Sequence, residues 1–256
     1  MPPSKAPVPE ISHKEALDIL KAYRRLLQSI PHALSREDLA LIHKAFKQAA
    51  DAHRHQRRRS GEPYIFHPIA VATIVATQMS LDATAIASAL LHDVVEDTDV
   101  TLEDIEREYG PTIARIIDGL TKISGISDSN VSVQAENFRK MLITISNDIR
   151  VILIKLADRL HNMQTMGAMI RQKQQKIASE TLYIYAPLAH RLGLYNIKTE
   201  MEDLSLKYTE PEAYENIVRL LRESDQAQKA YIARFIAEVK DMLDREDLDY
   251  TITGRN

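Results

Sequence analysis

The chain has 256 residues, of which 45% are hydrophobic, and this composition predicts a buried core rather than a disordered chain. Its 33 basic and 36 acidic side chains give a net charge of −3, so we expect no direct binding of nucleic acid by this chain. There is no cysteine, which excludes disulfides and thiolate metal sites and leaves imidazole and carboxylate groups as metal ligands.

The hydropathy of the chain also argues against a membrane protein. No apolar run approaches the ~20 residues needed to span a bilayer, and the proline-containing first ten residues lack the apolar region of a signal peptide. We therefore predict no membrane association and a cytoplasmic location.

The apolar spacing predicts helices along most of the chain, which indicates an all-α fold. Ser35 and Asp38 provide an N-cap and a capping-box partner for the second helix. The expected helices cover His13–Ser29, Arg36–Arg54, Ile69–Met79, Ala83–Glu96, Thr101–Tyr109, Pro111–Lys122, Gln134–Ser146, Asp148–Met163, Ile177–Leu194, Ile197–Tyr208 and Pro211–Asp244. Ser124–Ser132 is expected to be a mobile loop, Arg171–Lys176 a charged surface turn and Leu248–Gly254 a strand.

The segment His53–Tyr64 contains the densest basic run, with three consecutive arginines ending at Arg59. Gly61 and Pro63 disfavour a helix, so the arginines are expected at a helix end or in a loop. They form either a solvated basic turn or a contact to a phosphate or nucleobase, because arginine binds phosphate with two hydrogen bonds and stacks on rings.

The segment His92–Thr98 places an imidazole and three carboxylates close together. On a single helix covering Ala83–Glu96, His92 lies on the same face as Glu96, and Asp93 lies on the same face as Glu96 and Asp97. Like charges at this spacing destabilise a helix by roughly 0.2–0.5 kcal/mol per pair. A bound cation would neutralise them. The alternative is a solvated acidic helix end.

A second polar group of residues lies on the helix expected at Asp148–Met163, which is otherwise strongly apolar. The positions i, i+3, i+7 and i+10 form a polar stripe of Lys155, Asp158, Asn162 and Thr165. A buried aspartate is costly unless it is paired or bound to a metal. Asp158 is therefore either in an ion pair with Lys155 or Arg159, or a metal ligand.

Three separate segments thus contribute His67, which precedes Pro68 at a helix start, the pair His92 and Asp93, and Asp158. Two neutral imidazoles and two carboxylates can form a mononuclear metal site with positions left for water and substrate.

Glu96 and Asp97, one turn beyond Asp93, then become the groups that activate water and handle protons. The nearby arginine run supplies a clamp for a polyanion. Together these features predict the metal-assisted hydrolysis of a phosphate ester.

An ordered set of motifs makes this prediction more specific. The motifs are SGEPYIFHP, ALLHDVVEDT, DGLTKIS, AENFRKM, IKLADRLHNM, APLAHRLG and MEDLSLKY. In this order they resemble the hydrolase domain of the RelA/SpoT family, a branch of the HD-domain phosphohydrolases. The resemblance implies an all-α HD-domain helical bundle and a Mn²⁺ site formed by His67, His92, Asp93 and Asp158.

The resemblance further implies removal of the 3′-pyrophosphate from the stringent-response alarmones ppGpp and pppGpp, giving GDP or GTP and pyrophosphate. Carried over by residue, Glu96 and Asp97 are the catalytic acidic pair. Nucleotide contacts are expected from Arg58, which stacks on guanine, and from Arg59, Ser60, Asn162 and Thr165. We add Lys155 as a further substrate contact.

The sequence departs from the family pattern at two places. His55 stands where the family commonly has glycine, and we regard it as incidental to the site. Arg59 stands where lysine is common, which keeps the charge but not the compact geometry of lysine. The HD motif itself is intact, which favours a competent hydrolase.

Three regions are expected: a hydrolase domain at 1–200, a helical linker at 201–245, and the first strand of a synthetase domain at 246–256. The nucleotide-binding and catalytic parts of that domain are missing. We therefore expect an N-terminal fragment of a longer bifunctional protein, without synthetase activity and without the intramolecular synthetase and regulatory domains that would be its partners.

Two alternatives remain open. The first is another HD-family phosphohydrolase that acts on nucleotides or cyclic dinucleotides. The second is a non-catalytic regulatory module, in which the site binds alarmone or metal and the helices after Pro211 transmit the signal.

Overall fold

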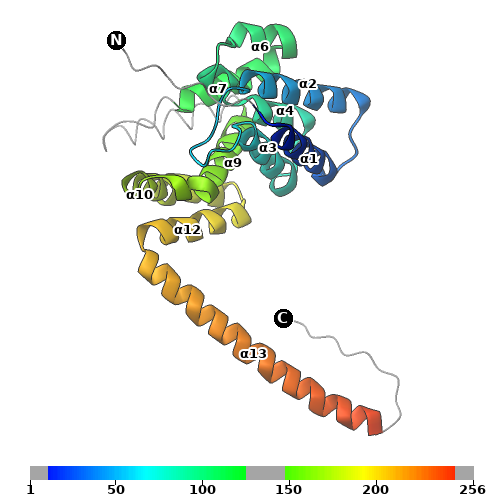
Figure 1. Ribbon diagram of the computed structural model, residues 1–256, viewed down its shortest axis with the longest axis vertical. Coiled ribbons are helices and arrows are strands. Elements are labelled where there is room, and N and C mark those ends of the chain that lie inside the picture. Colours follow the sequence, from blue (N-terminus) through cyan, green and yellow to red (C-terminus); the bar gives the residue numbers. More distant parts are fainter. Residues whose placement is uncertain (1–10, 125–147, 246–256) are drawn as a thin grey trace. The chain divides into compact units, whose positions relative to one another are not determined.

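The computed structural model describes residues 11–124 and 148–245 (Figure 1). In these ranges the chain is helical, apart from turns and one isolated β-bridge between Arg57 and Pro63. The all-α prediction is therefore confirmed. The loop expected at 124–132 (beyond its first residue), the helix at 134–146 and the strand at 248–254 lie outside the described ranges.

Contacts within the chain divide it into two units, the first ending at Ser205. The first unit holds α1 (His13–Ser29), α2 (Arg36–Ala52), α3 (Phe66–Gln78), α4 (Ala83–Leu91), α5 (Val94–Asp97), α6 (Leu102–Tyr109), α7 (Pro111–Ser124), α9 (Ile149–Thr165), the 3-10 turn η1 (Met166–Ala168), α10 (Arg171–Glu180), the π-helical turn η2 (Thr181–Tyr185), α11 (Ala186–Arg191) and most of α12 (Tyr195–Thr209). The second unit contains α13 (Pro211–Arg245), which is one continuous helix.

Side-chain caps explain where several helices begin. Ser12 and Ser35 accept hydrogen bonds from the third residue of α1 and α2, and the acidic side chains of Glu15 and Asp38 complete the two capping boxes. Asp82 caps α4 in the same way through the backbone N–H of Ala85. These local signals set the starts of α1, α2 and α4.

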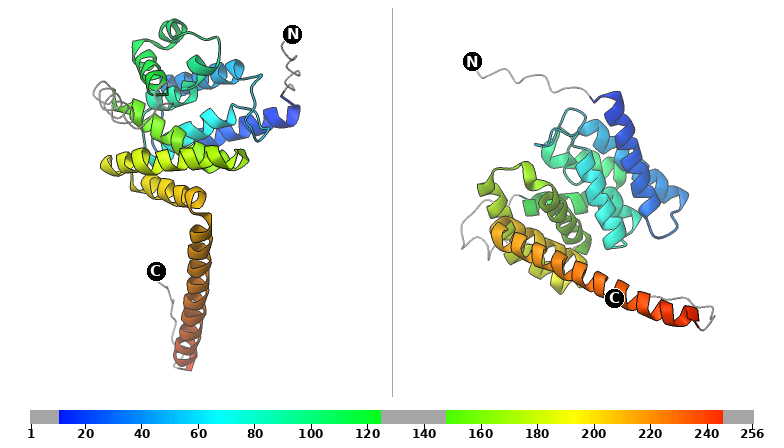
Figure 2. Two further views of the ribbon diagram at one scale, coloured as in Figure 1. Left: turned by 90° about the vertical axis from the view of Figure 1, so that its left-hand side faces the viewer. Right: turned by 60° about the horizontal axis from the view of Figure 1, so that its bottom comes forward.

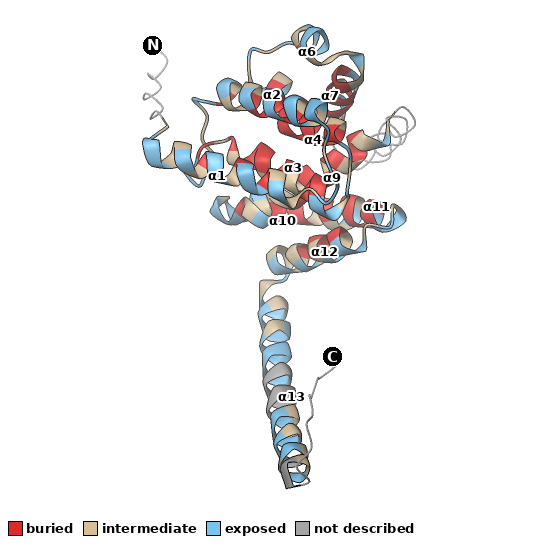
Figure 3. Cartoon of the chain, turned by 90° about the vertical axis from the view of Figure 1, so that its right-hand side faces the viewer, coloured by how far each residue is buried: buried red, intermediate tan, exposed pale blue. Residues whose placement is uncertain are grey.

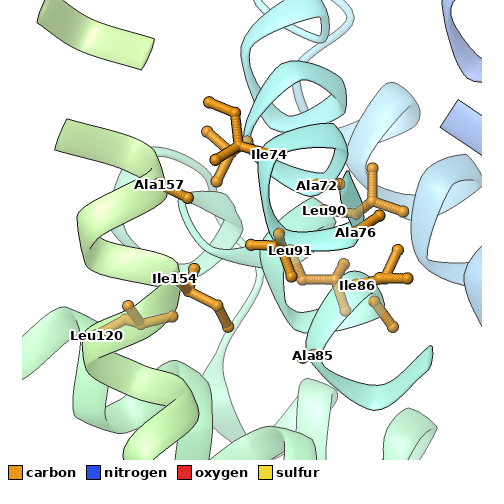
Figure 4. Packing of buried hydrophobic residues seen from close by; sticks show 14 of the residues in the cluster. Ala72, Ile74, Ala76, Ala85, Ile86, Leu90, Leu91, Leu120, Ile154 and Ala157 are labelled. Atoms are coloured by element: carbon orange, nitrogen blue, oxygen red, sulfur yellow. The ribbon is translucent and has the colours of Figure 1, made fainter. Parts of the chain in front are cut away.

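The core of the first unit is built around α3 and α4. These two helices lie between α1 and α2 on one side and α7 and α9 on the other (Figure 2). Eight of the nine residues of α4 are buried, as expected for a helix that is apolar nearly all round. Figure 3 shows that the buried residues concentrate in α3, α4 and α9. Figure 4 shows Leu91 of α4, Ile74 of α3 and Ile154 of α9 among the side chains of this buried cluster.

The helix expected at Ala83–Glu96 is in fact interrupted. Helix α4 ends at Leu91, and His92 and Asp93 form a turn before the short helix α5. Asp93 has φ −99° and ψ −3°, outside ideal helix geometry. Its carboxylate instead bonds to side chains from other elements, described below. The prediction of one unbroken helix is therefore wrong, although the N–H of Asp97 still bonds to the carbonyl of Asp93 at 2.9 Å, as in a helical turn.

The prediction for residues 171–194 also needs correction. The charged turn expected at Arg171–Lys176 is the first part of α10, and the long helix expected after it contains η2. Pro187 has no N–H, and its ring would clash with the carbonyl of Tyr183 in a regular α-helix. In η2 the N–H of Ala186 bonds to the carbonyl of Thr181, five residues earlier, and this wider turn accommodates the proline.

None of the helices in the two described ranges combines the length and the hydropathy required to cross a bilayer.

Candidate metal and substrate site

Three of the predicted metal ligands meet where α3 begins and α4 ends. The ligand atoms of His67, His92 and Asp93 all lie within 4.8 Å of one another. His67 lies in the first turn of α3, followed by Pro68, and the other two residues form the turn between α4 and α5. Both imidazoles are 2% exposed. The turn that interrupts the expected helix thus carries two of these three residues.

Asp158 reaches the same place from α9. Its Oδ1 lies 3.2 Å from His67 Nε2 and 3.8 Å from His92 Nε2. Asp93 Oδ2 lies 3.0 Å from His92 Nε2 and 3.6 Å from His67 Nε2. Ligands about 2.1 Å from one ion are about 3.0–3.5 Å apart at tetrahedral or octahedral angles. The four donors therefore surround one point at separations that suit a shared cation.

The hydrogen bonding of His92 also fits a metal ligand. Its Nδ1 donates to the carbonyl of Ala89 at 2.8 Å, which leaves the lone pair on Nε2. Within the described part of the chain this buried Nε2 has no hydrogen-bond partner. Burial disfavours a charge on His92, but Asp93 and Asp158 outweigh burial and raise its pKa to about 9. The cluster thus attracts positive charge to Nε2, which a divalent cation can supply.

The ion pair considered for Asp158 is present beside this cluster. Lys155 Nζ lies 2.9 Å from Asp158 Oδ2, while Oδ1 accepts a hydrogen bond from Asn162 Nδ2 at 2.6 Å. Burial lowers the pKa of Lys155, but Asp158 outweighs this effect and the pKa is raised overall. The two readings of Asp158 are compatible, because one oxygen pairs with Lys155 and the other faces the histidines.

The arginine run lies in a loop that is tied to two helices. Arg57 pairs with Glu15 of α1, with an Nη1–Oε1 distance of 2.6 Å. Arg58 reaches α9, where Nη2 donates to Asn162 Oδ1 at 2.9 Å. Arg59 and Ser60 follow in the chain and are exposed. The loop therefore places Arg58 next to the cluster and leaves the next two residues facing solvent.

The acidic pair lies on α5, and both Glu96 and Asp97 are exposed. Asp97 is connected to the cluster through Tyr64, whose hydroxyl lies 2.5 Å from Asp93 Oδ2 and 3.2 Å from Asp97 Oδ2. Gln56 Nε2 donates to the Asp97 carbonyl at 2.6 Å. The hydroxyl of Tyr64 thus connects Asp93, a predicted metal ligand, with Asp97, a predicted proton-transfer group.

Thr165 is the predicted contact residue farthest along α9. Its hydroxyl donates to the carbonyl of His161 at 2.8 Å, within its own helix. This bond does not link Thr165 to the cluster.

The sequence reasoning missed Tyr64 and His161. Tyr64 is three residues before His67, and His161 is three residues after Asp158. His161 shares α9 with Asp158 and lies about one helical turn from it, which is a spacing at which side chains share a face and which could have drawn attention to this residue. Tyr64 precedes α3, so helical spacing gives no such signal for it.

A protein-family model described as an HD domain matches residues 45–195. The chain belongs to the HD-domain family.

Named relatives refine this assignment. A protein from Streptomyces coelicolor named GTP pyrophosphokinase is 43% identical over 237 residues, which cover 93% of this chain and 28% of that protein. The bifunctional (p)ppGpp synthase/hydrolase SpoT of Escherichia coli is 42% identical over 234 residues, covering 91% of this chain and 33% of SpoT. A guanosine-3′,5′-bis(diphosphate) 3′-pyrophosphohydrolase from Haemophilus influenzae is 47% identical over 208 residues, which cover 81% of this chain and 31% of that protein.

These relatives confirm the resemblance to the RelA/SpoT family. The HD-domain chain spans about a third or less of the length of each of them.

Proposed function

We propose that this chain hydrolyses ppGpp and pppGpp at the 3′-position, releasing pyrophosphate and leaving GDP or GTP. The observation that carries the proposal is the cluster of His67, His92, Asp93 and Asp158 next to the arginine loop. Two of the relatives described above are named as hydrolases of this nucleotide. A third relative is named GTP pyrophosphokinase.

The proposed cofactor is Mn²⁺, held by the four clustered residues. Bound there, a divalent cation would lower the pKa of water and neutralise charge on the phosphoryl oxygens. The donor set supports this choice, because imidazole and carboxylate ligands together suit Mn²⁺. The buried Nε2 of His92 provides a lone pair for it.

Glu96 and Asp97 are proposed to move the protons. One carboxylate accepts a proton from the attacking water, whose oxygen forms the new bond to phosphorus. The bond from phosphorus to the 3′-oxygen breaks, and that oxygen must receive a proton. Exposure suits the pair to exchange protons with solvent between turnovers. Asp97 is held toward the cluster by the hydroxyl of Tyr64.

Arg58 is proposed to stack on the guanine base, with Asn162 and Thr165 lining the pocket. Hydrogen bonds from Arg58 to α9 fix the edge of the guanidinium group, which supports a stacking role for its face. Arg59 and Ser60 are proposed to contact the nucleotide from the exposed end of the loop, and Lys155 to contact the substrate beside Asp158.

We further propose that residues 1–200 form the hydrolase domain and residues 201–245 a helical linker that leads towards further domains. The division of internal contacts after Ser205 supports this boundary. The cytoplasm is the proposed location.

The decisive experiment is pyrophosphate release from ppGpp by the metal-stripped chain, with and without added Mn²⁺. The proposal expects release that requires the metal, together with GDP as the second product. Deoxynucleoside triphosphates and cyclic dinucleotides serve as competing substrates. Turnover of those compounds without turnover of ppGpp would instead identify another HD-family phosphohydrolase.

A regulatory module would bind ppGpp without turnover. The variants Glu96→Gln and Asp97→Asn separate this case from an enzyme, because they should remove hydrolysis while Mn²⁺ binding persists. If the unaltered chain binds ppGpp and Mn²⁺ but releases no pyrophosphate, the proposed hydrolase activity is wrong.

A further inference from the structure

His161 lies between a proposed metal ligand and a proposed nucleotide contact. Its Nδ1 is 2.7 Å from His67 Nδ1 and 3.1 Å from Arg58 Nη1. The rings of His161 and His67 are stacked, with centroids 4.9 Å apart. One nitrogen of His161 is therefore in hydrogen-bond range of both neighbours.

The direction of these hydrogen bonds follows from the chemistry of Arg58. A guanidinium group is always protonated and can only donate. His161 Nδ1 must therefore accept, which leaves the ring hydrogen of a neutral His161 on Nε2. Because Nδ1 accepts, the Nε2 hydrogen is the only one on the ring, and His161 is neutral in this arrangement.

The tautomer of His67 follows from that of His161. Because His161 Nδ1 has no hydrogen, the hydrogen in the 2.7 Å contact belongs to His67 Nδ1. His67 Nε2 then keeps its lone pair. This atom faces Asp158 Oδ1 at 3.2 Å and Asp93 Oδ2 at 3.6 Å, within the proposed metal cluster.

The two histidine ligands thus differ in what orients them. His92 donates its Nδ1 hydrogen to the backbone carbonyl of Ala89, a partner that no substitution removes. His67 donates to a side chain, and that side chain also accepts from Arg58.

We propose that His161 is a positioning residue that holds His67 in the tautomer with Nε2 available to the metal, and that Arg58 sets the tautomer of His161. The link to nucleotide recognition rests on the function proposed above for Arg58. The metal-positioning part can be tested without any nucleotide.

Two substitutions at His161 separate hydrogen bonding from packing. In His161→Asn, the side-chain amide oxygen can accept at the place of Nδ1, whereas His161→Leu offers no acceptor. We expect Mn²⁺ affinity, measured from free Mn²⁺ by electron paramagnetic resonance, to fall about 10–100-fold in the leucine variant. The asparagine variant should retain most of the affinity. The matched control is His55→Asn, which changes an exposed histidine and should bind Mn²⁺ like the unaltered chain.

Nitrogen-15 NMR spectra of the metal-free protein give a second measurement. We expect His67 to carry its hydrogen on Nδ1 in the unaltered chain and in His161→Asn. In His161→Leu the two His67 tautomers should mix. Arg58→Met removes the obligatory donor, so His161 and His67 should then also show mixed tautomers.

Unchanged Mn²⁺ affinity in His161→Leu, or an equal loss in the asparagine and leucine variants, would overturn the positioning role. Unchanged tautomers in Arg58→Met would overturn the role of Arg58, and this variant keeps the test informative if His161→Leu does not fold. Absence of ppGpp hydrolysis would overturn the proposed function, but neither the Mn²⁺ affinities nor the NMR spectra depend on it.

Discussion

The two halves of the candidate site are held by different kinds of structure. The buried half consists of His67, His92 and Asp158, which are 2–6% exposed and are attached to the core helices α3, α4 and α9. The exposed half includes Glu96 and Asp97 on the four-residue helix α5, together with the end of the arginine loop. Core packing fixes the groups proposed to hold the metal, whereas the groups proposed to meet water and substrate lie on short elements at the surface.

This difference predicts two classes of variant. Changes in the buried half should reduce both stability and metal binding, because each group has partners that cannot reach water. Changes in the exposed half should alter rate or nucleotide affinity and leave the fold intact.

The largest effect is expected for Asp158→Ala. It removes a proposed metal ligand and the carboxylate that pairs with the largely buried Lys155 at 2.9 Å. Loss of one partner of a buried ion pair costs about 3–5 kcal/mol. Urea unfolding of the metal-free protein measures this loss, and Mn²⁺ binding should disappear. The double variant Asp158→Ala/Lys155→Met should recover part of the stability. If Asp158→Ala lowered the unfolding free energy by less than about 1 kcal/mol, the buried half would not differ from the exposed half in its contribution to stability.

The next effect is expected in the exposed half, for Glu96→Gln and Asp97→Asn. Loss of general acid–base catalysis should lower the hydrolysis rate about 10²–10⁴-fold. The urea midpoint and Mn²⁺ affinity should stay as in the unaltered chain. Glu103→Gln, which changes an exposed acidic residue in the first turn of α6, is the matched control. If the urea midpoint of these variants fell together with their hydrolysis rate, Glu96 and Asp97 would contribute to the fold like the buried residues, and the division into two halves would be wrong.

Arg58 lies at the border between the halves and is half-buried. Arg58→Ala removes the proposed stacking on guanine, so KM for ppGpp should rise about tenfold, equivalent to ~1.4 kcal/mol. Arg54→Ala, an exposed arginine four residues earlier, should leave KM unchanged. If Arg58→Ala and Arg54→Ala raised KM equally, Arg58 would contribute only its positive charge and would not stack on the base.

The smallest effect concerns the attachment of the arginine loop to α1. The Arg57 hydrogen bond, with help from Ser12, lowers the pKa of Glu15 from 4.5 to about 2. A lowered carboxyl pKa stabilises the fold above the unfolded-state value, and this contribution is lost as pH falls toward the folded-state value. Unfolding free energies of the unaltered chain and Glu15→Gln should therefore converge between pH 4.5 and pH 2. A difference that widened in acid would contradict this sign.

Local sequence signals predicted much of the fold. Ser35 with Asp38 marked the start of α2, and the continuous apolar character of α4 placed it in the core. Such features depend on residues close together in the chain. The break at Asp93 could not be predicted in this way, because it accompanies a hydrogen bond from Tyr64, 29 residues earlier.

The same limit applies to the site. Residue types and motifs predicted the four clustered donors, which the fold brings together from three segments. The partners of these donors were harder to find. His161 contacts His67 across 94 positions of sequence, and no property of a single histidine predicts which nitrogen it offers. Side-chain hydrogen bonds between distant elements were therefore the part that required the structure.

The π-helical turn η2 has a consequence for how this segment can change in evolution. Each residue turns an α-helix by about 100°, so the extra residue in η2 rotates everything that follows by that angle. This rotation helps bring Tyr185 under the guanidinium of Arg159, 4.2 Å from the ring centroid, and turns Leu188 and Ala189 into the core. A one-residue deletion in Thr181–Tyr185 would present a different face of α11 to the core. The segment should therefore tolerate substitution more readily than a change in length.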